Sequence, residues 1–187
     1  AKQVNEILKL SHKILEIDPK EFDSVSKKIR NTINTDNLSW NENSIAFHYV
    51  SKLAQSLGLD MVVTANGIDE LFCGYNGYRD AIKQGNDTVM QLMDAKLDNE
   101  IKMMRAINQV CSEFDVKIVQ PLLSEEFVKY AKTIPIDQKI IDENDLQRKH
   151  IIRKLALQVG VPELSANARK KALQYGSMIH KALLKSR

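Results

Sequence analysis

An apolar run that breaks into a turn and then presents two adjacent carboxylates constrains this chain more than any other segment. The run is Met61-Val62-Val63-Thr64-Ala65, and Asn66-Gly67-Ile68-Asp69-Glu70 follows it. Short β-branched runs beside turn residues are typical of buried strands. Ligands of open α/β sheets bind beyond the carboxyl ends of the strands, so we expect Asp69 and Glu70 at the rim of an active site. The simpler alternative is a strand-turn-helix unit in which both carboxylates solvate a helix start.

The first 75 residues show a pattern of alternating helices and strands. The predicted elements are a helix at the start of the chain with Val4, Ile7 and Leu8 on one face, a strand at 12–17, a helix from Pro19 to about Thr35 capped by Asp18, a helix capped by Asn41 or Asn43 and ended by Gly58, and a strand beginning at Met61. Strands separated by helices imply a parallel sheet with right-handed crossovers.

Beyond Tyr75 the pattern becomes mainly helical. It predicts a long helix from Asn86 to about Phe114, an extended segment at 116–119, and helices beginning near Ser124, Asp145 and Ser177. No Gly-rich or Pro-rich linker justifies a domain boundary. We therefore predict a single domain over residues 1–187, with an α/β half at 1–75 and a helical half at 76–187.

The composition is that of an ordinary globular chain. Hydrophobic residues make up 43% and charged residues 27% of the 187 residues. The apolar runs are far shorter than the roughly 20 residues that a membrane helix needs. Cys73 and Cys111 show no metal-ligand spacing, and neither do the four histidines. We therefore expect a cytoplasmic protein with reduced thiols.

Charge is distributed unevenly along the chain. Residues 148–187 carry ten Lys and Arg against one Glu, whereas residues 1–147 carry 17 basic and 23 acidic side chains. Such a basic segment forms solvated helix faces, binds nucleic acid or faces a polyphosphate. Tyr175 is its one aromatic residue and no nucleic-acid motif is found, so we expect no nucleic-acid partner; the other two alternatives remain.

The segment from Gly67 to Tyr75 also resembles the signature of the asparagine synthetase family. The shared residues are Gly67, Asp69 to Phe72, and Gly74-Tyr75. Similar blocks follow in the family's order and spacing: Gln120-Pro121-Leu122-Leu123-Ser124, Lys149-His150-Ile151-Ile152-Arg153-Lys154, Arg169-Lys170-Lys171 and Gln174-Tyr175-Gly176-Ser177. The resemblance covers nearly the whole chain. It implies a parallel sheet of the ATP-pyrophosphatase (adenine nucleotide alpha hydrolase-like) type, followed by a mainly helical half.

The resemblance implies a ligase that uses ATP and Mg²⁺ to convert a carboxylate into an amide. In the family's reaction, aspartate becomes β-aspartyl-AMP with loss of pyrophosphate, and ammonia then displaces AMP to give asparagine. The implied partners are therefore the small molecules ATP, aspartate and ammonia. Neither nucleic acid nor a membrane is expected as a partner, and a homodimer is compatible with the family.

The resemblance also assigns roles to single residues. Asp69 is expected to bind Mg²⁺, with Glu70 in a supporting or capping position. Lys171 is expected to stabilise the charge on the leaving pyrophosphate, with electrostatic support from Arg169 and Lys149. Thr64 and Ala65 would line the nucleotide pocket with backbone groups, and Gly67 would allow a close approach of the backbone there. Arg153 either adds to this positive charge or forms a structural ion pair.

Three departures from the family pattern support a second hypothesis. The Ser-Gly-Gly-x-Asp-Ser phosphate loop does not occur in these 187 residues, and we expect it upstream of Ala1. Asn66 stands where an acid is usual and can hydrogen-bond but not ionise. Lys117 and Ser124 replace a glutamate and an aspartate on the substrate side. The alternative to a ligase is therefore a degenerate homologue that acts as a nucleotide-binding or structural module.

Overall fold

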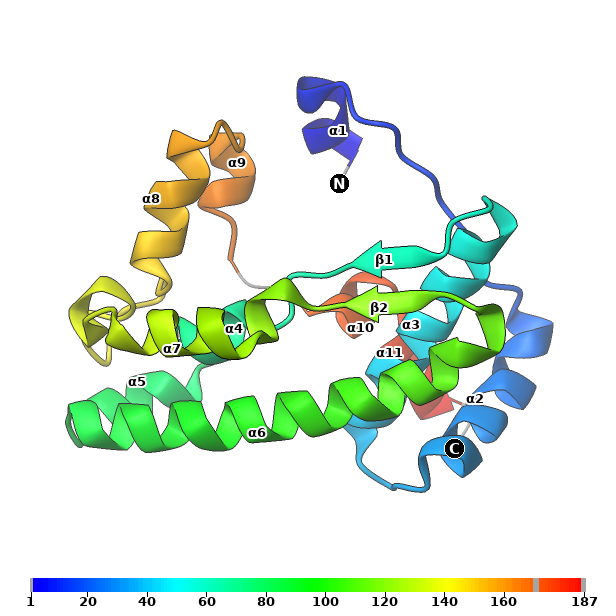
Figure 1. The fold of residues 1–187 in the computed structure, drawn as a ribbon, viewed down its shortest axis with the longest axis horizontal. Helices are drawn as coiled ribbons and strands as arrows, with labels where there is room; N and C mark the ends of the chain where they lie inside the picture. Colours follow the sequence, from blue (N-terminus) through cyan, green and yellow to red (C-terminus); the bar gives the residue numbers. More distant parts are fainter. Residues whose placement is uncertain (1, 170–171, 186–187) are drawn as a thin grey trace. The chain divides into compact units, whose positions relative to one another are not determined.

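The computed structural model describes residues 2–169 and 172–185, which form two compact units. We name them the signature unit, residues 2–13, 65–100 and 120–169, and the sheet unit, residues 14–64, 101–119 and 172–185. Most of the described residues are helical (Figure 1). None of the helices in the described ranges is long and apolar enough to cross a membrane.

The sheet unit contains the two described strands. β1 (Met61–Val63) and β2 (Lys117–Val119) run parallel, with Val62 opposite Ile118 (Figure 1). The predicted parallel sheet is thus confirmed as a small two-stranded one. The expectation that the strand beginning at Met61 is buried is wrong, because Met61 and Val63 are 49% and 64% exposed. With one neighbouring strand, β1 has a covered side chain only at Val62, which is half-buried.

Helices pack together to form the core of the sheet unit. α2 (Pro19–Ile33) and α3 (Leu38–Ser56) contact each other, and the short α10 (Leu173–Gly176) and α11 (Ile179–Lys185) pack against α3. The buried cluster consists of Phe22, Ile29, Ile45, Ala46, Tyr49, Val110 and Ile179. Burial of a large apolar side chain is worth roughly 1.5–3 kcal/mol, so this cluster stabilises the unit.

The start of α2 confirms a cap predicted from sequence, whereas the segment before it corrects a predicted strand. Asp18 accepts a hydrogen bond from Lys20 N at 2.8 Å, and Pro19 is the first helical residue. Residues 11–18 have no regular structure. Ile14 is exposed, while Ile17 packs against the helical core. No strand in the described ranges pairs with this segment, so apolar residues alone do not make it a strand.

The cap of α3 also differs from the prediction. Asn37, and not Asn41 or Asn43, precedes the helix, and its side chain accepts a hydrogen bond from Trp40 N at 3.2 Å. Asn41 is buried inside the first turns, where its amide donates to Thr35 O at 2.8 Å and to Asn37 O at 2.9 Å. Several asparagines in one polar stretch offer the same capping chemistry, so spacing did not distinguish them.

The signature unit is helical. Its elements are α1 (Lys2–Leu8), α4 (Ile68–Leu71), α5 (Gly77–Ile82), the first part of α6 (Asn86–Cys111), η2 (Pro121–Leu123), α7 (Glu125–Thr133), η3 (Ile136–Gln138), α8 (His150–Gln158) and α9 (Glu163–Ala166). The long helix from Asn86 is confirmed, and its last turn tightens into η1 (Ser112–Phe114). Ser124 caps α7 as predicted, with its hydroxyl accepting from Phe127 N at 3.3 Å.

One predicted helix start lies elsewhere in the structure. α8 begins at His150 rather than near Asp145, whereas α11 begins at Ile179, close to the predicted Ser177. Asp145 does cap backbone amides, but they belong to a loop and not to a helix. An acidic residue before an apolar stretch can therefore accept hydrogen bonds from backbone amides without marking the start of a helix.

Candidate functional site

The turn after β1 is positioned by a glycine that no other residue could replace without strain. Gly67 has φ +106°, and a Cβ there would lie 2.9 Å from Leu123 Cδ2 and 3.0 Å from Leu122 O. Left-handed backbone together with this close approach requires glycine. The close approach observed is to η2 of the same unit; the predicted approach to a nucleotide stays a prediction.

Glu70 makes hydrogen bonds that stabilise the conformation of the signature segment. Its carboxylate accepts hydrogen bonds from Gly67 N at 3.2 Å and from the Tyr75 hydroxyl, and its backbone oxygen accepts from the Tyr78 hydroxyl at 2.6 Å. Glu70 is buried, and burial together with this carboxylate raises the pKa of Tyr75. Glu70 therefore has the capping position that was expected as one alternative.

Asp69 and Lys149 form an ion pair across the signature unit. Lys149 Nζ lies 2.9 Å from Asp69 Oδ1, and the two side chains are 18% and 25% exposed in the order Lys149, Asp69. Eighty residues separate them in sequence, yet both were predicted from sequence to belong to one site. A partly buried pair of opposite charges is screened less by salt than a surface pair.

The predicted Asn66 contacts a carboxylate that sequence reasoning missed. Its amide nitrogen donates to Glu100 Oε1 at 2.7 Å, and Glu100 is buried on α6. The available signal was Glu100's place on the apolar face of that helix, in step with the buried Met93, Leu97 and Met104. A buried acid in an apolar stripe needs a partner, and Asn66 is one.

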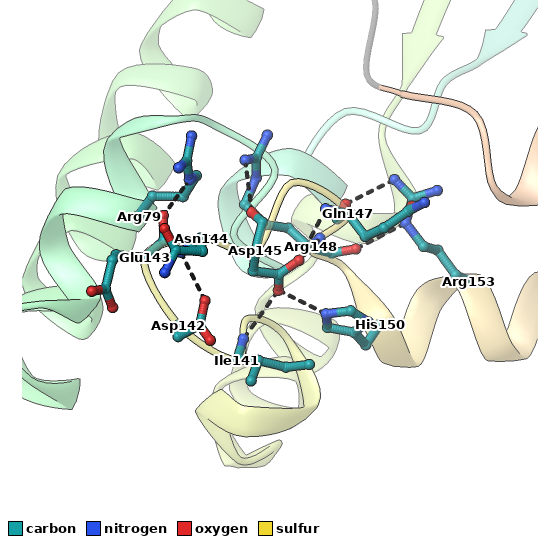
Figure 2. A network of polar contacts seen from close by, with 10 residues as sticks. All are labelled: Arg79, Ile141, Asp142, Glu143, Asn144, Asp145, Gln147, Arg148, His150 and Arg153. Atoms are coloured by element: carbon teal, nitrogen blue, oxygen red, sulfur yellow. Dashed lines mark hydrogen bonds and ion pairs between the residues drawn. The ribbon is translucent and has the colours of Figure 1, made fainter.

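The loop before Lys149 is organised by Asp145 (Figure 2). The Asp145 carboxylate accepts from Ile141 N at 3.1 Å, from Gln147 N and Arg148 N at 2.9 Å, and it contacts His150 Nε2 at 2.7 Å. Burial alone would raise the pKa of Asp145, but the hydrogen bonds from backbone amides and from His150 hold it below its usual value. An ionised Asp145 therefore stabilises the loop.

The end of this loop has an uncommon backbone conformation. Arg148 and Lys149 have φ of +49° and +54°, a left-handed conformation that costs non-glycine residues energy. The network around Asp145 is the structural feature that holds them there. Strain of this kind clusters at binding and catalytic sites, which adds to the case that Lys149 is placed for function.

Arg153 is a structural residue, but through partners that were not expected. Among the described residues, its guanidinium donates to four backbone carbonyls: Gln147 O at 2.9 Å, Arg148 O at 2.9 Å, Ala166 O at 2.6 Å and Ala168 O at 3.1 Å. In place of the predicted ion pair, Arg153 connects the loop at 141–149 to the segment after α9 by hydrogen bonds, while its charge interacts with Asp145 and Asp69 without a direct contact.

The remaining predicted residues are placed as follows. Thr64 N donates to Val119 O at 2.9 Å in the sheet unit, Ala65 follows it, and Arg169 lines a pocket of the signature unit. Lys171, the predicted catalytic cation, lies outside the described residues. The nucleotide-binding roles of these residues stay predictions.

The described residues restrict how a magnesium ion could bind. No group of three His, Cys, Asp or Glu residues suited to a metal occurs within the described ranges. The carboxylate of Glu70 is committed to Gly67 and Tyr75. Mg²⁺ commonly uses one or two protein carboxylates and takes substrate phosphates and water for the rest, and Asp69 fits that requirement as a single ligand.

Cys73 serves packing rather than reactivity. It is fully buried, and burial raises the pKa of its thiol to about 12. A thiol of that pKa is not an effective nucleophile near neutral pH. This outcome agrees with the packing alternative and removes Cys73 from the candidate site.

The comparisons with known proteins agree with the resemblance in the signature. The family model described as asparagine synthase matches residues 1–113. A putative glutamine-hydrolyzing asparagine synthetase 1 of Methanocaldococcus jannaschii is 27% identical over 216 residues, covering 99% of this chain and 39% of the relative. An asparagine synthetase domain-containing protein of Drosophila melanogaster is 26% identical over 144 residues, covering 72% of this chain and 25% of the relative. The chain thus spans well under half the length of these curated relatives.

Proposed function

Because this chain belongs to the asparagine synthase family, we propose that it carries out ATP-dependent amidation of a carboxylic acid, with aspartate as acceptor and asparagine as product. In this reaction the β-carboxylate attacks the α-phosphorus of ATP and pyrophosphate leaves. Ammonia then forms a bond to the acyl carbon of β-aspartyl-AMP, AMP leaves, and the nitrogen loses a proton to give the amide.

The Asp69–Lys149 pair is the observation that carries this proposal. Both partners are only partly exposed, and they lie 2.9 Å apart. Lys149 can pair with a phosphate oxygen in place of Asp69, which would leave the Asp69 carboxylate as a ligand for Mg²⁺. Bound Mg²⁺ would neutralise charge on the phosphates. The pair therefore offers one cation for phosphate and one anion for metal, with each held in place until the substrate arrives.

The contact between Asn66 and Glu100 supports a catalytic rather than a degenerate site. Asn66 cannot ionise, but its amide nitrogen lies 2.7 Å from the Glu100 carboxylate. That carboxylate supplies an ionisable group next to the position that is usually acidic in the family. The second candidate, a nucleotide-binding or structural module, is favoured by Asn66 itself and by the ion pair that neutralises Asp69 without ligand.

Release of pyrophosphate from ATP tests the proposal. The assay contains Mg²⁺, aspartate and ammonia, and compares the wild type with Asp69→Asn. We expect a loss of about 100-fold in the variant, because a metal ligand supplies several kcal/mol of transition-state stabilisation. Asp80→Asn is the matched control, since Asp80 is exposed on α5 and has no ion-pair partner in the described part of the chain.

Each result separates the two candidates. Pyrophosphate release that requires aspartate and is lost only in Asp69→Asn supports amidation of aspartate. ATP binding without pyrophosphate release, for aspartate and for other carboxylic acids, would support the nucleotide-binding module instead. Equal rates in the wild type and in Asp69→Asn would contradict the role of Asp69.

A further inference from the structure

A second feature of the signature unit is a pocket with three arginines, which we name the arginine pocket. It measures about 410 Å³ and is lined by Arg79, Arg148 and Arg169, by the Gly74–Asn76 loop and by Leu146. No Asp or Glu is among these lining residues. Three guanidinium groups around one small space, with no carboxylate among the residues that line it, are unfavourable without an anion.

Arg148 is the buried member of the arginine pocket. It is 7% exposed, and within the described ranges its terminal nitrogens make two long hydrogen bonds, to Asp145 O at 3.3 Å and to Gly74 O at 3.4 Å. Its Nε is buried and has no hydrogen-bond partner among the described residues. A buried donor without a partner is unfavourable, and more so in a charged group, so a ligand that accepts a hydrogen bond from Arg148 would stabilise this arrangement.

Arg79 adds a second positive charge beside Arg148. Its Nε donates to Glu143 O at 2.5 Å, and Figure 2 shows its guanidinium on the same side of the loop as that of Arg148. Burial lowers the pKa of Arg148, the charge of Asp145 raises it, and the charge of Arg79 lowers it further. The nearby carboxylates are already engaged, Asp145 with backbone amides and His150, and Asp69 with Lys149. These two carboxylates therefore compensate only part of the positive charge of the arginine pocket.

We propose that the arginine pocket binds the oxyanion of a small ligand, either a carboxylate or a phosphate. Guanidinium groups present forked donors that match both anions. The volume lies in the range of small-molecule sites, and Leu146 offers an apolar wall for the rest of the ligand. Gly74 lines the pocket and also touches Asp69, so the pocket adjoins the candidate site. If the proposed function holds, the inference assigns this pocket to the second oxyanion of the substrates.

Isothermal titration of the purified protein, without ATP or Mg²⁺, tests this inference with two probes. Inorganic pyrophosphate represents the phosphate source, and succinate represents the carboxylate source. We expect one of the two to bind at millimolar concentration or below, more weakly as salt is raised. Arg79→Gln should weaken that binding by about tenfold or more, since a charge-assisted hydrogen bond is worth roughly 1.5–3 kcal/mol. Arg105→Gln, at an exposed position of α6, is the matched control and should bind as the wild type does.

A second variant keeps the test decisive if Arg79→Gln does not fold. Arg169→Gln changes an exposed arginine on a separate segment of the same pocket and should weaken the same probe. The inference is overturned if neither probe binds, or if the folded variants bind as tightly as the wild type. Because no ATP is present, probe binding that depends on Arg79 can coexist with a failure of pyrophosphate release. The two proposals can therefore fail separately.

Discussion

Gly74 lies directly against Asp69. A Cβ at Gly74 would be 2.0 Å from Asp69 Oδ1 and 2.7 Å from Asp69 Cα, and Gly74 N donates to Asp69 O at 2.7 Å. The backbone of Gly74 is not in the left-handed region, so the requirement for glycine is one of space and not of φ. The last glycine of the signature thereby sets where the Asp69 carboxylate can lie.

We predict that Gly74→Ala displaces Asp69 from Lys149. The added methyl group overlaps both the side chain and the backbone of Asp69, so the free energy of unfolding should fall by roughly 1–3 kcal/mol. Urea denaturation measures this change, and pyrophosphate release should fall with it. Gly77→Ala is the control, because its nearest atom would be 3.8 Å away, and it should leave stability within about 0.5 kcal/mol of the wild type or raise it. Equal stability of the two variants would contradict the close packing.

We predict that Arg153→Lys destabilises the chain although it keeps the charge. Four hydrogen bonds to carbonyls depend on the planar guanidinium, and an ammonium cannot reach all of them. The free energy of unfolding should decrease by roughly 2–4 kcal/mol, as measured in urea. Arg105→Lys, on the exposed face of α6, should change it by less than about 0.5 kcal/mol. A stable Arg153→Lys protein that loses only pyrophosphate release would instead indicate a direct role for this charge.

Local signals predicted much of this fold from sequence. Asp18 with Pro19, Ser124 and the long helix from Asn86 all depend on neighbours a few residues away, and the structure confirms each of them. The strand predicted at 12–17 failed because a strand exists only with a partner, and none in the described ranges pairs with it. Pairing is a property of the whole fold and is not encoded in the segment alone.

The candidate site was predictable where a contiguous motif carries it. The motif places Asp69, Glu70 and Gly74 within six consecutive residues, and Gly74 N donates a hydrogen bond to Asp69 O. The contacts of Asp69 with Lys149 and of Asn66 with Glu100 span 80 and 34 residues. The family resemblance assigned Asp69 and Lys149 to one site but did not predict their contact. The place of Glu100 on an apolar helix face indicated that it needs a partner, but not that the partner is Asn66.

We predict that Lys139→Met is neutral or stabilising. Lys139 is fully buried, donates to Ala131 O at 2.8 Å and lies 5.5 Å from the centre of the Phe72 ring, but none of these partners carries a negative charge. Methionine has a similar shape and no charge to bury. Ala131 O would keep its hydrogen bond from Ile134 N. The free energy of unfolding should therefore stay within about 1 kcal/mol of the wild type or increase.

The same variant should change how stability depends on pH. Burial lowers the pKa of Lys139 from 10.5, so the unfolded chain binds more protons between the folded pKa and 10.5. Wild-type stability then rises with pH across that interval, and the advantage of Lys139→Met should shrink as pH approaches 10.5. Urea denaturation at several pH values measures this, with the exposed Lys129→Met as control. A constant difference between the wild type and Lys139→Met would contradict the lowered pKa.

We predict that His48 makes the sheet unit less stable in mild acid. His48 Nδ1 lies 2.9 Å from Glu113 Oε1, but burial lowers the pKa of His48 from 6.5 more than Glu113 raises it. The unfolded chain therefore binds more protons than the folded protein just below pH 6.5. The free energy of unfolding decreases as pH falls from 6.5 towards the pKa of His48 in the folded protein, by about 1.4 kcal/mol for each pH unit between these two values. Urea denaturation from pH 7.5 to 5 measures this effect. As pH falls, the free energy of unfolding of the wild type should decrease relative to that of His48→Gln. The control is His12→Gln at an exposed position, relative to which no such decrease is expected. A wild type that gains stability on acidification would mean that the ion pair with Glu113 outweighs burial.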